Sequence, residues 1–168
     1  MPADYLELFC AVYAQVHDSL YHWAFAIYTQ GSSSRGWHIY EVVQERRVCG
    51  GREYRAVHRQ ANPNRSTSCL KPLVPLGLVH KSKWAAITEK IESVPIAVPR
   101  RRRWNCQSYV LDIWNRLLMC RIVDGEAWQR GRDMMLPYHG QARLCGYSEK
   151  EGERRFTSNE FVYDSSDE

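Results

Sequence analysis

Apolar and polar residues alternate with a period of two along much of the first half of the chain, which is typical of β-strands with one buried face. Strands are predicted over residues 4–14, 21–29, 37–43, 53–58 and 73–80. The turn-rich sequence QGSSSRG separates the second strand from the third, so residues 21–43 are predicted to form a β-hairpin. The polar segment RQANPNRSTS after the fourth strand is predicted to be a loop.

After residue 82 the apolar residues recur at helical spacing instead. A helix is predicted over residues 82–93 with Ser82 as its N-cap, and the prolines of VPIAVPRRRR make the following connector extended. A second amphipathic helix is predicted to begin near Asn105, and a shorter helix is predicted around 126–135. Strands followed by helices indicate an α+β fold in which an antiparallel sheet packs against helices.

The chain has 168 residues, of which 44% are hydrophobic, and this is enough for one domain with its own core. We expect that domain over residues 1–147, followed by an acidic, flexible tail over 148–168. No run approaches the roughly 18 apolar residues of a membrane helix, and the first residues lack a signal-peptide pattern, so we expect a cytoplasmic protein without a membrane-spanning segment. The six cysteines form no CxxC pair, so we expect reduced thiols, no metal site and no cofactor.

Charge is distributed unevenly along the chain. The net charge is +4, but the residues after 147 hold seven acids and three bases, which leaves the preceding body at +8. Four consecutive arginines strengthen the basic character of the body: Arg100, Arg101, Arg102 and Arg103. Guanidinium groups bind phosphates by paired hydrogen bonds, so RNA or another polyanion is a candidate partner of this run.

Cys106 follows the arginine run, at the predicted start of the second helix. The positive end of a helix dipole stabilises a thiolate, and a nucleophilic thiol also needs an imidazole in reach and a polar group that orients the imidazole. His22 shares a strand face with the small Ala24 and Ala26, which would let a helix lie close to the sheet. His38 lies on the other strand of the hairpin. A buried structural thiol and core histidines are the alternative interpretation.

The segments YHWAFAI, GWHIYEV and WNCQSYV together resemble the circularly permuted papain-like superfamily, in particular its lecithin retinol acyltransferase-like group. The resemblance is closest to small uncharacterised fungal proteins with HWA and WNC motifs, and it covers roughly residues 5–125. It implies that Cys106 is the nucleophile, that His22 is the base and that His38 orients the base. Glu41 is an alternative to His38, although alternation places the two on opposite strand faces. Gln107 departs from the acid that follows the cysteine in the acyltransferase-like members.

The resemblance implies cysteine-dependent acyl transfer, by an acyltransferase or an amide or ester hydrolase, through a thioester acyl-enzyme. Backbone N–H groups at the helix start would stabilise the oxyanion. Candidate substrate-binding residues are Tyr21, Trp23, Tyr40, Trp104, Gln107 and the four arginines of residues 100–103. The partner would be an acyl donor. Two alternatives remain open: a transferase that uses aminoacyl-tRNA and binds RNA through the arginine run, and a polyanion-binding module without catalysis.

Overall fold

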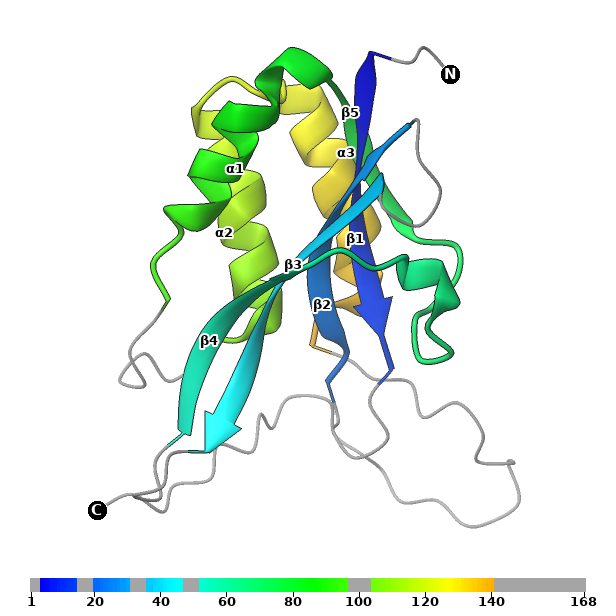
Figure 1. The fold of residues 1–168 in the computed structure, drawn as a ribbon, viewed down its shortest axis with the longest axis vertical. Coiled ribbons are helices and arrows are strands. Elements are labelled where there is room, and N and C mark those ends of the chain that lie inside the picture. Colours follow the sequence, from blue (N-terminus) through cyan, green and yellow to red (C-terminus); the bar gives the residue numbers. More distant parts are fainter. Residues whose placement is uncertain (1–3, 15–19, 31–35, 47–51, 97–103, 141–168) are drawn as a thin grey trace.

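Five antiparallel strands form a sheet in the order β4-β3-β2-β1-β5 (Figure 1). This architecture comes from a computed structural model that describes residues 4–14, 20–30, 36–46, 52–96 and 104–140. The strands are β1 (Tyr5–Tyr13), β2 (His22–Thr29), β3 (Trp37–Arg46), β4 (Arg52–Arg59) and β5 (Val74–His80). All five predicted strands are therefore confirmed, and β3 extends beyond the predicted residue 43.

Three α-helices follow the sheet within the described residues. They are α1 (Trp84–Glu92), α2 (Cys106–Met119) and α3 (Gly125–Met135). Short 3-10 turns lie at Pro63–Arg65, Lys81–Lys83 and Leu136–Tyr138. The predicted N-cap of the first helix is wrong, because His80 accepts the Ser82 N–H and the 3-10 turn precedes α1. The α+β class with an antiparallel sheet against helices is confirmed.

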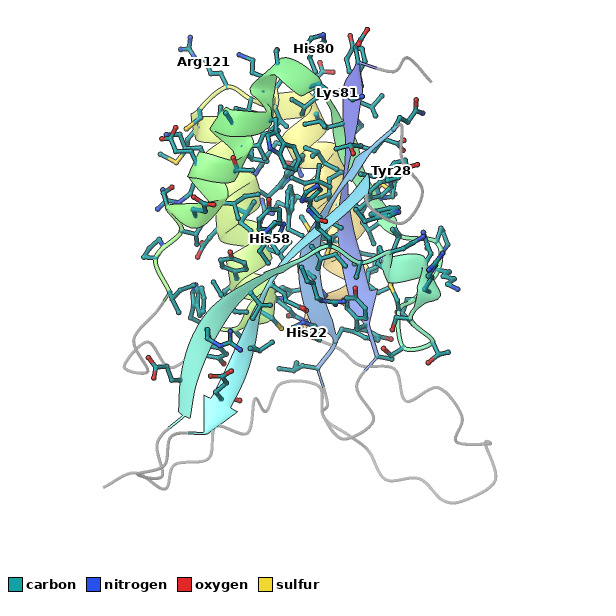
Figure 2. All side chains as sticks on the ribbon, viewed as in Figure 1. His22, Tyr28, His58, His80, Lys81 and Arg121 are labelled. Carbon is teal, nitrogen blue, oxygen red and sulfur yellow. The ribbon has the colours of Figure 1, made fainter. Side chains whose placement is uncertain are left out.

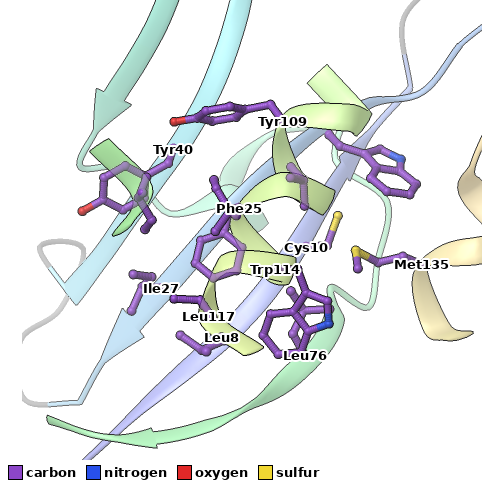
Figure 3. Packing of buried hydrophobic residues seen from close by; sticks show 14 of the residues in the cluster. Leu8, Cys10, Phe25, Ile27, Tyr40, Leu76, Tyr109, Trp114, Leu117 and Met135 are labelled. Atoms are coloured by element: carbon purple, nitrogen blue, oxygen red, sulfur yellow. The ribbon is translucent and has the colours of Figure 1, made fainter. Parts of the chain in front are cut away.

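The helices cover one face of the sheet, where the larger hydrophobic core lies (Figure 3). Alternation along β2 directs its large residues to this face, among them Phe25 and Ile27. From α2, Trp114 and Leu117 pack on the same cluster, and both are fully buried. The amphipathic stripe predicted for this helix therefore faces the sheet, and it fixes α2 across β2 and β3.

The opposite face of the sheet carries a smaller cluster. Ala24 and Ala26 of β2 pack there with Cys69 and Leu73, which belong to the segment between β4 and β5. The expectation that a helix packs on these small residues is wrong, because the large side chains of β2 lie on the other face and bury more apolar surface against the helices.

Two expected features lie outside the described residues. The extended connector falls mostly on residues 97–103, and the acidic tail over 148–168 lies wholly beyond residue 140. None of the described helices combines the length and the apolar character needed to cross a membrane.

Candidate active site

Cys106 is the first residue of α2, and the residue before it caps the helix. The Oδ1 atom of Asn105 accepts hydrogen bonds from the backbone N–H of Gln107 at 2.9 Å and of Ser108 at 3.1 Å. An asparagine side chain satisfies the otherwise unpaired amides of a first helical turn in this way. The predicted helix start is therefore confirmed, and the half-buried Cys106 lies at the positive end of the helix dipole.

His22 is the first residue of β2, at the same end of the fold as the start of α2 (Figure 2). Its Nε2 donates a hydrogen bond to Oε2 of Glu41 over 2.7 Å, and only 15% of its side chain is exposed. Burial alone would lower the pKa of His22, but hydrogen bonds with Cys106 and Glu41 raise it to about 9. Since Glu41 occupies Nε2, Nδ1 is the ring nitrogen that faces Cys106.

Glu41 is a buried carboxylate on β3, with 6% of its surface exposed. Its Oε1 accepts a second hydrogen bond, from Nε of Arg59 over 2.7 Å. Burial would raise the pKa of this carboxyl, but the hydrogen bonds from His22 and Arg59 outweigh burial and lower the pKa. Glu41 therefore stays ionised and joins the His22 ring to a guanidinium.

The structure does not bring His38 to His22. His38 Nδ1 lies 3.1 Å from Nε2 of His58, and its ring meets Trp84 edge-on at 4.6 Å. The predicted contact of His38 with His22 is therefore wrong, and Glu41, the alternative that the sequence had left open, contacts the His22 ring instead. Burial, together with the neighbouring His58, lowers the pKa of His38.

The register of the hairpin explains this correction. Ile27 pairs with His38, so His38 shares the helix-covered face with Ile27. Even-numbered residues of β2 therefore share a face with odd-numbered residues of β3, which puts His22 with Glu41. A register shifted by one residue would have put His22 with His38 instead.

Gln107, which was predicted to bind substrate, is buried and bonded to backbone groups. It is 1% exposed, its Nε2 donates to the backbone oxygens of Tyr21 at 3.0 Å and Tyr138 at 3.4 Å, and its Oε1 accepts the Gly140 N–H at 3.1 Å. These bonds tie the first turn of α2 to the residue before β2. They hold Cys106 and His22 at a fixed separation, because each lies next to one of the bonded residues in the chain.

The aromatic residues predicted to bind substrate differ in their exposure to solvent. Trp23 has no exposed surface, and Tyr21 is 5% exposed. Trp104 is partly exposed, and its Nε1 donates to Oδ2 of Asp112 over 2.9 Å. Tyr40 stacks on His58 with ring centroids 4.4 Å apart. Of these residues, Trp104 lies nearest to Cys106 in the chain, two residues before it, and part of its surface is exposed.

A hollow of about 160 Å³ lies one helical turn along α2 from Cys106. Tyr40 and Tyr109 line it, together with Ile91 and Glu92 at the end of α1. Burial, with the Glu92 carboxylate nearby, raises the pKa of both tyrosines to about 12, so their hydroxyls stay protonated. The hydroxyls point away from the core (Figure 3).

One amide of the first turn of α2 has no acceptor among the described residues. The N–H groups of Gln107 and Ser108 are bonded to Asn105, but within the described part of the chain no acceptor meets the N–H of Cys106. The expected oxyanion donors are therefore reduced here to that one amide. The arginines of residues 100–103 lie outside the described residues, and the described ranges contain no group of three or more metal-ligating side chains arranged to hold a metal ion.

Comparison of this chain with protein-family models, with curated proteins and with solved structures finds no match. The geometry of Cys106, His22, Glu41 and Arg59 is therefore the basis on which a function is inferred. Sequence reasoning missed Arg59 entirely. The feature that could have indicated Arg59 is the pairing of β3 with β4. This pairing places Arg59 opposite Ile39, and so diagonally across from Glu41 on the same face of the sheet.

Proposed function

We propose that the protein is a cysteine-dependent acyl-transfer enzyme, either an acyltransferase or an amide or ester hydrolase. Cys106 is the nucleophile, His22 is the base, and Glu41 orients the base. One observation carries the proposal: the His22 ring is held between the thiol at a helix start and a buried, ionised carboxylate. A nucleophile, a base and a group that orients the base are the three parts that thiol catalysis requires.

In the first half-reaction, Nδ1 of His22 takes the proton of the Cys106 thiol, and the thiolate attacks the carbonyl carbon of an ester, amide or thioester. The carbonyl oxygen becomes an oxyanion beside the N–H of Cys106. The oxyanion then re-forms the carbonyl, and the bond to the leaving group breaks as His22 returns its proton to that group. The product is a thioester on Cys106.

In the second half-reaction, His22 takes a proton from water, an amine or a hydroxyl, and this nucleophile attacks the thioester. The carbon–sulfur bond breaks, and the sulfur regains a proton from His22. In the free enzyme the pKa of His22 is about 9, so the ring is already an imidazolium beside Cys106 before the acyl donor binds, and thioester formation returns it to the neutral form that this half-reaction needs. The ionised Glu41 stabilises that cation during both steps.

Intact-mass spectrometry after incubation with p-nitrophenyl acetate and with short acyl thioesters tests the proposal. We expect one acetyl or acyl adduct on the wild-type chain, mapped by peptide analysis to Cys106. The adduct should be absent from Cys106→Ala, should form far more slowly on His22→Ala, and should persist in Cys120→Ala. An adduct that persists unchanged in a folded Cys106→Ala variant would refute the assignment of the nucleophile.

A further inference from the structure

Arg59 and His22 bind opposite oxygens of the same carboxylate. The Arg59 Nε donates to Oε1 of Glu41, the His22 Nε2 donates to Oε2, and each distance is 2.7 Å. The three residues come from three adjacent strands, β4, β3 and β2. With both oxygens bound, rotation of the carboxylate would break two charge-assisted hydrogen bonds at once.

We propose that Arg59 is a positioning residue of the acyl-transfer site: it keeps Glu41 ionised and directs Oε2 at His22. This inference rests on the proposed function. Arg59 binds Glu41 and also Tyr13, and none of the contacts among the described residues joins it to Cys106, so its path to the thiol runs through Glu41 and His22.

The burial of Glu41 explains why a cation is needed there. A carboxylate with 6% of its surface exposed loses most of its hydration, and this loss favours the neutral acid unless charged hydrogen bonds compensate. His22 supplies one such bond only while it is protonated, whereas a guanidinium stays charged at every relevant pH. Arg59 is therefore the partner that keeps Glu41 ionised independently of the catalytic proton.

Three further titratable groups lie around this cluster. The ring of Tyr13 on β1 lies 5.9 Å from that of His22, and Tyr13 interacts electrostatically with Glu41 and Arg59. Burial raises the pKa of Tyr13 to about 12, so it stays neutral. Cys69 lies on the same face, where burial raises its pKa and Lys71 acts on it as a cation. Tyr13 and Cys69 therefore stay uncharged between pH 5 and 8, so they do not mask a change in Glu41.

A second ion pair on the same two strands provides a matched control. Arg55 of β4 donates to Oε1 of Glu45 on β3 at 2.6 Å, but its side chain is 60% exposed and that of Glu45 is 51% exposed. Arg55 and Arg59 thus share a strand, a residue type and a glutamate partner on β3. They differ in burial of the glutamate and in its contact with His22.

The test follows carbamidomethylation of Cys106 by iodoacetamide from pH 5 to pH 8, by peptide mass, and needs no substrate. Removal of the cation in Arg59→Met lets Glu41 take a proton at higher pH, so the ion pair of His22 with Cys106 should also form at higher pH. We expect the acid side of the labelling profile to move up by about one pH unit, which is about tenfold slower labelling on that side. Arg59→Lys should recover most of the shift, and Arg55→Met should show none.

A double substitution separates positioning from a structural effect. In a Glu41→Gln background the carboxylate is gone, so Arg59→Met should change labelling by less than about twofold if Arg59 acts through Glu41. An Arg59→Met profile that coincides with wild type, or a tenfold effect that persists in the Glu41→Gln background, would overturn the inference. Circular dichroism confirms that each variant is folded. If no acyl donor modifies the protein, the proposed function fails, while the labelling profiles still decide the role of Arg59.

Discussion

Glu41 and His22 are 19 residues apart in the chain, yet Oε2 of the carboxylate lies 2.7 Å from Nε2 of the ring. The contact crosses two adjacent strands on the face of the sheet opposite the three helices. It leaves Nδ1 of His22 free to face Cys106, because His22 opens β2 beside the start of α2. The site thus combines His22 at the start of a strand, Glu41 within a strand and Cys106 at the start of a helix.

Cys106 and Cys120 provide a test within one helix, since the first begins α2 and the second caps its C-terminal end. Cys120 is exposed and Cys106 is only half-buried, so accessibility alone would favour Cys120. The helix dipole stabilises a thiolate at the N-terminal end and destabilises it at the other end, and the His22 cation is near Cys106 alone. We expect iodoacetamide at pH 7 to label Cys106 about tenfold faster than Cys120. Peptide mapping measures both rates, and equal rates would contradict the placement of the thiolate.

The raised pKa of His22 predicts a pH-dependent stability. A group with a folded-state pKa near 9, against about 6.5 in the unfolded chain, contributes its full stabilisation below pH 6.5 and loses it as pH rises through 9. The difference in free energy of unfolding between wild type and His22→Asn should therefore fall across this interval, by up to about 3 kcal/mol. Urea unfolding at pH 6, 7.5 and 9 measures it. A difference that is constant with pH would show that His22 titrates as in the unfolded chain.

The sequence was sufficient to place the proposed nucleophile and the proposed base on their elements. Asparagine before a stripe of apolar residues at helical spacing predicts where α2 begins, and the cap bonds of Asn105 confirm it. Alternation likewise predicts β2 and its two faces, with His22 beside Ala24. These features depend on local spacing, which one sequence displays directly.

The partner of His22 could not be fixed in the same way, because it depends on strand register. The sequence alone does not distinguish registers of β2 and β3 that differ by one residue, and such a shift exchanges His38 for Glu41 on the face of His22. Arg59 depends on a second register, between β3 and β4. The role of Gln107 required knowledge that Tyr21, 86 residues away, presents its carbonyl to the first turn of α2.

Replacement of Gln107 by an apolar residue is expected to lower the free energy of unfolding strongly without any change of charge. In Gln107→Leu the carbonyl of Tyr21 and the N–H of Gly140 lose their buried partner, and each unmet polar group costs 1 kcal/mol or more, so we expect a loss of about 3 kcal/mol. Gln129→Leu is the control, because Gln129 on α3 is exposed and bonds Asp133 at the surface. We expect its effect to stay within about 0.5 kcal/mol. Urea unfolding compares the two, and similar losses would mean that Gln107 does not tie α2 to β2.

The last prediction decides between the two groups that could orient the base. Glu41→Gln removes the charge that stabilises the His22 cation, so we expect kcat on an activated ester to fall by about a hundredfold. It should also lower the pKa of His22, because the carboxylate bond that raises it is lost. His38→Asn should leave kcat within about threefold of wild type, since His38 contacts His58 and Trp84 on the other face of the sheet.

Two further variants calibrate this comparison. His22→Ala should remove nearly all activity, and adding Cys106→Ala should make little further difference, because residues that act as one unit give non-additive losses. NMR titration of the imidazole signals, assigned through His22→Ala, measures the pKa of His22 in Glu41→Gln and in His38→Asn. The opposite result would be a His38→Asn variant with greatly reduced kcat and a Glu41→Gln variant with full activity, both folded by circular dichroism. It would show that His38 orients the base in solution and that the active register of β2 and β3 differs from the one observed.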